Sequence, residues 1–232
     1  MKVRSSRVFT AALALVAVSG CTPYTQVKQQ RLEAVPLSER GYVIGRYGVD
    51  CWHKSQTKCQ QSFNALTTYL GQVEQPATPD DYIPGILKAE FGSITGNDTE
   101  WDIVDLQSRQ RWFYFCEVVR GGEQQFNAIR YWNYAGGGSG YQVPNEGSLG
   151  LRFDAPAGVV TYIGWIKAAT GDGRNLVGLR VPSPLGLQVG EGTEDDYAQA
   201  LQRCPVEAQG LEVRRVVLDA ASAGHPMVGV LR

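Results

Sequence analysis

The stretch that decides the fold is Arg109–Val119, which reads Arg-Gln-Arg-Trp-Phe-Tyr-Phe-Cys-Glu-Val-Val. It is rich in the aromatic and β-branched residues that fit a pleated, half-buried strand. The turn signal Arg120-Gly121-Gly122 follows, and Gln124–Tyr134 then alternates between apolar and polar residues. We therefore predict that these two segments pair as an antiparallel hairpin. One face of the first strand carries four side chains that we expect in the core: Trp112, Tyr114, Cys116 and Val118.

A second pair of segments has the same form. Leu149–Phe153 and Val159–Lys167 flank the turn Ala155-Pro156-Ala157-Gly158, and their period-2 pattern predicts another antiparallel hairpin. The likeness of the two pairs has two explanations, which the sequence leaves open. Either the chain contains a weak internal repeat, or two separate hairpins show the same pattern because both consist of half-buried antiparallel strands.

The remaining segments predict more strands and one helix. Thr193–Arg203 is the predicted helix, because Thr193 is a suitable N-cap and three acidic residues follow it in the first turn. Gln60–Leu70 is compatible with a strand or a short helix, and its Thr, Tyr and Phe content favours a strand. Further short strands are predicted at Tyr42–Val49, Lys88–Ile94, Trp101–Leu106, Leu211–Leu218 and Met227–Leu231. We predict a mainly β protein, an antiparallel β-sandwich (Ig-like or jelly-roll-like) with one short C-terminal helix.

The composition limits the classes of protein to which the chain can belong. It has 232 residues, of which 43% are apolar and 19% charged, a profile of ordered globular proteins. Its 22 basic and 23 acidic residues give a formal net charge of −1. Without a basic block, nucleic acid is not expected as a partner.

The first twenty residues form an export signal rather than part of the fold. Lys2, Arg4 and Arg7 precede the almost purely apolar stretch Val8–Val18, which is too short to span a bilayer as a helix. The sequence Val18-Ser19-Gly20-Cys21 follows and resembles the lipobox of bacterial lipoproteins. That resemblance implies cleavage before Cys21 and acylation of both its sulfur and its new amine. The alternative is an ordinary signal peptide in which Cys21 has no such role.

The lipobox resemblance also implies where the protein resides. In the proteobacterial system an Asp after the lipidated Cys indicates retention in the inner membrane, whereas Thr22 occupies that position here. The resemblance therefore implies a lipid anchor in the outer membrane, with the protein facing the periplasm. Several acyl chains give stable anchoring without spanning.

The chain then divides into three parts. Residues 1–20 are the signal, residues 21–40 a polar tether that begins with the lipidated Cys21, and residues 41–232 a single β-sandwich domain. Removal of the signal takes away three basic residues and no acidic one, which leaves 19 basic and 23 acidic residues. The mature chain therefore has a net charge of −4, and the acyl anchor is expected to act without electrostatic attraction to anionic lipid.

The body of the chain resembles a second group of proteins. Its segment Asp154–Gly164, with a Pro-x-Gly turn followed by Tyr-Ile-Gly, is similar to segments of uncharacterised proteobacterial outer-membrane lipoproteins. The resemblance implies a β-sandwich-like fold and no known activity, so it supplies no catalytic residues. The chain departs from that pattern because its first turn, Arg120–Gly122, has no proline, and because it has additional cysteines.

Four cysteines remain after the lipid anchor is assigned. An even number in an exported domain predicts disulfides, and of the three possible arrangements we favour Cys51–Cys59 with Cys116–Cys204. The first pair would close a short hairpin, and the second would connect the middle of the domain to the C-terminal helix. A metal site at Cys51, His53 and Cys59 is the alternative, but their spacing matches no zinc-finger pattern.

No motif indicates catalysis. The chain lacks a Gly-x-Ser-x-Gly elbow and a phosphate-binding loop, so we predict no catalytic residue, no metal and no cofactor. Trp132, Tyr134 and Tyr141 flank a glycine-rich loop and are the candidates for an exposed binding face, unless they belong to the core. The expected function is therefore that of a non-enzymatic envelope lipoprotein that binds or supports an envelope protein partner. The alternatives are a carbohydrate- or peptidoglycan-binding lipoprotein and an enzyme of unrecognised type.

Overall fold

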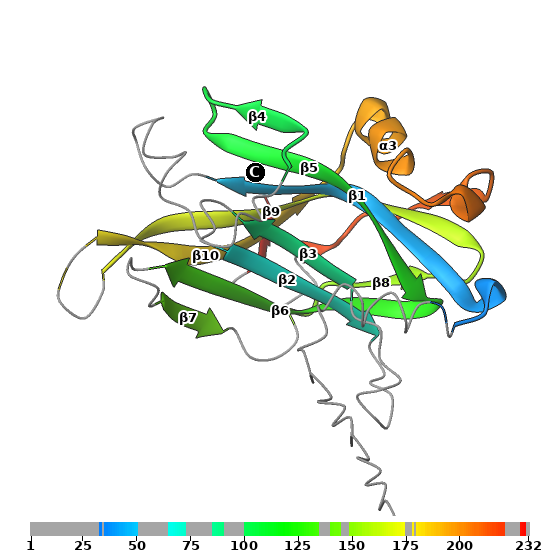
Figure 1. Cartoon of the computed structure of the whole chain (residues 1–232), viewed down its shortest axis with the longest axis horizontal. Coiled ribbons are helices and arrows are strands. Elements are labelled where there is room, and N and C mark those ends of the chain that lie inside the picture. Colours follow the sequence, from blue (N-terminus) through cyan, green and yellow to red (C-terminus); the bar gives the residue numbers. More distant parts are fainter. Residues whose placement is uncertain are drawn as a thin grey trace, which may run out of the picture.

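The protein is mainly β structure, as the sequence predicts, and is built from two sheets (Figure 1). The computed structural model describes residues 33, 35–50, 65–72, 85–90, 100–134, 140–144, 149–174, 178, 180–220 and 228–230. The strands are β1 (Arg40–Asp50), β2 (Ala65–Gln72), β3 (Gly85–Glu90), β4 (Ile103–Asp105), β5 (Gln110–Arg120), β6 (Gly122–Tyr134), β7 (Gly140–Pro144), β8 (Arg152–Ala155), β9 (Val159–Arg174), β10 (Arg180–Gly190), β11 (Glu212–Arg215) and β12 (Val228–Val230). The helical elements are η1 (Leu37–Glu39), α3 (Glu194–Leu201) and η3 (Val206–Ala208).

The larger sheet has seven strands and mixed direction. Its order is β12-β10-β9-β1-β5-β4, with β11 paired to β9, and the pairs β1–β9, β9–β11 and β10–β12 are parallel. The smaller, five-stranded sheet has the order β3-β2-β6-β7, with β8 paired to β6, and its pairs are antiparallel. The prediction of antiparallel pairing therefore holds for the smaller sheet and only in part for the larger one. The parallel pair β1–β9 arises because the chain leaves the larger sheet after β5 and re-enters it at β9, beside β1, whereas β11 and β12 return to the sheet after α3.

Neither predicted hairpin forms, which corrects the expectation from the sequence. β5 pairs with β1 over its whole length, whereas β6 pairs with β2, β7 and β8 in the other sheet. Likewise β8 pairs with β6, whereas β9 pairs with β1, β10 and β11. Each strand–turn–strand unit therefore carries the chain from one sheet to the other.

The two crossings lie against each other at the start of β1. The N–H of Gly121 donates to the carbonyl of Glu39, and that of Gly158 donates to the carbonyl of Arg40, both at 2.8 Å. A Cβ atom on Gly121 would lie 2.5 Å from the backbone nitrogen of Ala157. The close approach of the two crossings thus requires glycine at position 121.

The main core lies between the two sheets. It combines residues of both, such as Tyr47 and Ile166 of the larger sheet with Phe126 and Phe153 of the smaller one. From β5 it takes Phe115 and Val119, with Phe113 packed at its edge. The strand face predicted as core (Trp112, Tyr114, Cys116 and Val118) instead lies on the opposite side of the sheet, where Trp112 is buried and the other three are half-buried.

The other predicted elements agree with the structure where it describes them. The helix begins after Thr193 as expected, and the described part of the segment predicted at 60–70 belongs to β2. β10, with its two prolines, and β7, which begins at the last residue of the glycine-rich loop, are strands that the sequence does not predict. The predicted signal, Cys21, residues 22–32 and 34 of the predicted tether, Cys51, His53 and Cys59 lie outside the described residues. Among those that are described, no helix has the length and apolar composition needed to span a bilayer.

Candidate functional site

The outer face of the larger sheet holds a second, smaller apolar cluster, covered by α3. Ala200 of α3 and Cys204, which follows the helix, are buried against Tyr42, Ile44 and other residues of β1 and β9. Tyr197 and Leu201 pack at the edge of the same cluster, so one face of the helix is apolar and covers the sheet. A helix of 8 residues is too short to be stable alone in water, so its contacts with the sheet must hold it.

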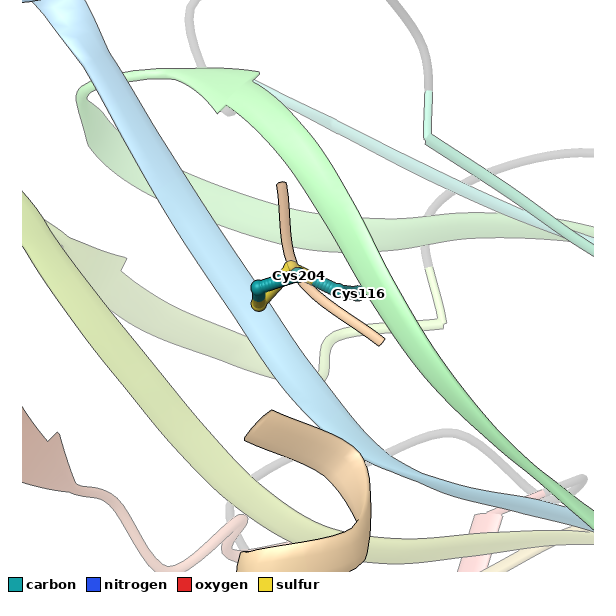
Figure 2. Close-up of a disulfide and its surroundings, with 2 residues drawn as sticks. All are labelled: Cys116 and Cys204. Carbon is teal, nitrogen blue, oxygen red and sulfur yellow. A yellow bond between two sulfur atoms is a disulfide. The ribbon is translucent and has the colours of Figure 1, made fainter. Parts of the chain in front are cut away.

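A disulfide bonds the C-terminal side of this helix to the sheet. Cys116 on β5 and Cys204, just after α3, have their sulfur atoms 2.03 Å apart and their Cα atoms 5.1 Å apart (Figure 2). This pairing confirms one of the two predicted disulfides. The two residues are 88 positions apart in the chain. Disulfides stabilise typically by about 2–4 kcal/mol, and by more when the closed loop is long.

A buried carboxylate holds the N-terminal side of α3. Asp196 accepts a hydrogen bond from Arg46 Nη1 at 2.8 Å and one from the hydroxyl of Tyr114 at 3.1 Å, both through Oδ1. Its Oδ2 accepts from the backbone N–H and from the hydroxyl of Thr193, at 2.9 and 3.0 Å. Thr193 in turn accepts from the N–H of Asp196, which completes a capping box. One carboxylate thus joins β1, β5 and the helix N-cap.

The tyrosines around Asp196 are held in their neutral form. Burial raises the pKa of Tyr162 to about 12, and the negative charge of Asp196 adds to this rise. The pKa of Tyr114 is raised first by burial and then by the hydrogen bond that it donates to Asp196. Both phenols therefore stay protonated near neutral pH, and Tyr114 remains a hydrogen-bond donor.

Two tryptophans extend this outer face beyond the helix. Trp112 lies over Gly48, its neighbour on β1, and Trp165 lies over Gly190, its neighbour on β10. Cβ atoms at these two glycines would come within 2.1 Å and 2.3 Å of the indole rings, so the rings need glycine beneath them. The two rings meet edge to face at 5.8 Å. The guanidinium of Arg46 lies 4.3 Å from the centre of the Trp112 ring, a cation–π contact.

A buried ion pair lies in the same region. Lys167 of β9 is buried, and its Nζ is 3.2 Å from Oδ1 of Asp50 at the end of β1. In the register of the sheet, Lys167 is next to Gly48, and therefore in the same row as Trp112. The outer face thus carries Arg46 and Lys167 in successive rows, each with a carboxylate partner.

The residues predicted as a binding face lie in the smaller sheet. Trp132 and Tyr134 belong to β6, and Tyr141 belongs to β7, which pairs with it. In the register, Trp132 is opposite Gln142 and Tyr141 is opposite Asn133, so Tyr141 belongs to the other face of the sheet from Trp132 and Tyr134. The structure describes these residues only by their backbone, so their exposure stays a prediction.

The polar cluster around Asp196 was missed by reasoning from the sequence. Asp196 was predicted to favour the helix dipole, but its neighbours come from distant strands. One signal was present: Arg46 is a charged residue within the otherwise apolar stretch Tyr42–Val49, and such a residue needs a partner when the strand is central. Neither the partner's identity nor its position can be deduced from that stretch.

The chemistry of this cluster is that of a structural connection. Four donated hydrogen bonds saturate the carboxylate of Asp196, which leaves it no lone pair directed at a substrate. Over the part of the chain that the structure describes, no group of three or more His, Cys, Asp or Glu side chains could hold a metal ion. Comparison of the chain with family models, curated proteins and solved structures gave no match.

Proposed function

We propose that this protein is a non-enzymatic lipoprotein of the bacterial envelope that presents its sandwich domain to another envelope component. The lipobox Val18-Ser19-Gly20-Cys21 supports the anchor, and Thr22 favours the outer membrane with the domain in the periplasm. The Cys116–Cys204 disulfide is compatible with a periplasmic location, because such bonds persist in oxidising compartments.

The observation that carries the non-enzymatic part of the proposal is the saturation of Asp196. Arg46, Tyr114 and Thr193 are all engaged in fixing α3 to the sheet. Groups that act in catalysis must instead face a substrate. The most polar cluster of the described side chains therefore favours a rigid scaffold.

Fractionation of cells tests the anchor. We expect Cys21→Ala to move the protein from the membrane fraction to the soluble periplasmic fraction, because its acyl chains can no longer be attached. Thr22→Ala is the matched control, which changes the neighbouring residue and keeps the membrane location. Retention of Cys21→Ala in the membrane after removal of residues 1–20, as checked by mass analysis of the N-terminus, would contradict the lipoprotein assignment.

Cross-linking in intact cells tests the role of the domain. We expect a specific envelope protein to be recovered with the lipidated protein and to be lost or reduced with Cys21→Ala, since the anchor concentrates the domain at the membrane. Recovery of abundant envelope proteins alone, in equal amounts from both forms, would contradict a binding function at the membrane.

Binding of carbohydrate or peptidoglycan is the second candidate function. It is favoured by the register of β6 and β7, which places Trp132 opposite Gln142 and therefore on the same face of the sheet. Aromatic residues beside amides are the combination that stacks on sugar rings and hydrogen-bonds their hydroxyls. We expect the protein to co-sediment with purified peptidoglycan and Trp132→Ala to weaken this binding, with unfolding curves as the control for folding. Equal sedimentation of parent and variant would exclude this surface.

A further inference from the structure

One end of the domain combines two short helices, η1 and η3, with the two crossings between the sheets. Figure 1 shows η1 (blue) and η3 (orange) at the same end as the β8–β9 crossing. The side chain of Arg40, which follows η1, reaches Glu207 of η3 at 3.8 Å. The two short helices are therefore neighbours, and β1 starts between them and the crossings.

Each of these helices exposes one large apolar side chain. Leu37 of η1 is 58% exposed, and Val206 of η3 is 80% exposed. Both helices are fixed by their neighbours, because Val35 and Ala208 are buried and Arg40 Nε donates to the carbonyl of Val35 at 3.0 Å. The fold thus holds both apolar side chains in solvent.

The charges at this end compensate one another. Arg40 pairs with Glu207, and Arg120 lies 3.9 Å from Glu39. This matters because the mature chain has an excess of acidic residues, which an anionic lipid surface repels. An end with paired charges and exposed apolar side chains can approach such a surface without that repulsion.

The predicted anchor joins the domain at this same end. Residues 22–34 separate Cys21 from Val35. A chain of that length reaches roughly 50 Å when fully extended, and about 20 Å on average as a flexible coil. The end that carries Leu37 is thus the part of the described domain nearest to the anchor along the chain. The anchor would hold it at a high effective concentration near the lipid.

We propose that Leu37 and Val206 rest on the lipid surface in which the protein is anchored, so that η1 and η3 form a membrane-facing foot. This inference rests on the proposed lipid anchor and adds an orientation to it. The foot leaves the smaller sheet and β4 available to a partner. Weak apolar contact is sufficient here, because the acyl chains supply the affinity and the two side chains only orient the domain.

Site-specific photo-cross-linking tests the foot. A photoreactive amino acid replaces Leu37, Val206 or Val104 in the full lipidated chain, reconstituted in vesicles of phosphatidylethanolamine and phosphatidylglycerol. Val104 is the matched control, because it is an apolar residue that is 48% exposed and lies on β4. We expect several-fold more lipid adduct at positions 37 and 206 than at position 104. Equal labelling at the three positions, or adducts only to protein, would overturn the proposal.

Failure of the inference is distinguishable from failure of the proposed function. If Cys21→Ala stays bound to membranes after residues 1–20 have been removed, the lipid anchor itself is wrong. If Cys21→Ala is released but the lipidated chain gives no lipid adduct at positions 37 and 206, the anchor stands and only the orientation is wrong. Circular dichroism of each labelled protein, compared with the parent, checks that the substitution leaves the fold intact.

Discussion

The two faces of the seven-stranded sheet are held by different kinds of interaction. The inner face packs against the second sheet through a wide apolar cluster with buried aromatic and aliphatic side chains. The outer face is covered by one helix of 8 residues, held by a disulfide, a capping box and the hydrogen bonds of Asp196. The inner face thus distributes its stability over many contacts, whereas the outer face concentrates it in a few groups that substitutions can remove separately.

The largest effect is expected at the inner face, from Phe126→Ala. Phe126 is fully buried, and its ring lies 5.9 Å from that of Phe153. Loss of such a ring leaves a cavity and should lower the free energy of unfolding by about 4 kcal/mol. Urea titration followed by fluorescence measures this change. Val104→Ala, at an exposed position, is the control, and equal losses in the two variants would contradict a core that lies between the sheets.

Removal of the disulfide is the next largest change and affects the outer face. We expect the double variant Cys116→Ala, Cys204→Ala to lose about 3 kcal/mol in the free energy of unfolding. Because the bond holds the C-terminal side of α3, faster hydrogen exchange should be concentrated in Glu194–Leu201. Exchange that accelerates equally in both sheets would show that the outer face is not an independent unit.

A smaller loss is expected from Asp196→Ala, which keeps the disulfide. It leaves Arg46 without its carboxylate and removes the capping box, so the free energy of unfolding should fall by about 2 kcal/mol. Asp195→Ala is the matched control at the neighbouring, exposed position and should change stability much less. If both variants behave alike under thermal unfolding, Asp196 contributes only its negative charge near the helix start.

The smallest effect near neutral pH is expected from Tyr162→Phe, and in alkali the variant should gain stability relative to the parent. Burial raises the pKa of Tyr162 from 10.0 to about 12. Between these values the unfolded chain loses the proton first, so this group's contribution is fully present below pH 10 and is lost as the pH rises to about 12. Urea midpoints of Tyr162→Phe should therefore decline less steeply over this range than those of the parent. Parallel declines would contradict a buried neutral phenol at this position.

The residue pattern of short segments was sufficient to predict several strands and the helix. The aromatic and β-branched residues of β5, the alternation in β9 and the N-cap Thr193 are signals within short segments, and each predicted its element. The Cys116–Cys204 pair was also correctly predicted, because the four cysteines that follow Cys21 allow only three arrangements of pairs.

The pairing of the strands could not be predicted from such short segments. A strand, a glycine turn and a second strand look alike whether the chain stays in one sheet or crosses to another. In the structure the two turns pack against each other through Gly121 and Ala157, and this contact between separate turns cannot be deduced from either turn alone. Asp196 and Arg46 pose the same difficulty, because 150 positions separate them in the chain.

Prolines explain the strand that was missed. Pro182 and Pro184 are typical of loops, because proline cannot donate a hydrogen bond to a ladder. In the structure both residues pair with β9, and β12 contacts β10 only at Leu187–Val189. Over the described residues, the prolines therefore occupy a part of β10 that has a strand on one side alone, where a missing donor costs little.

The position of β1 has a mechanical consequence. β1 begins at the end of the domain where the chain enters from the N-terminus, and it lies between β5 and β9 in the middle of the larger sheet. A pull on the N-terminal segment would act along β1 and load its hydrogen bonds to both neighbours together, in shear, instead of opening them one after another. Under the lipid anchoring that we propose, traction from the membrane would therefore load β1 and its two neighbouring strands first.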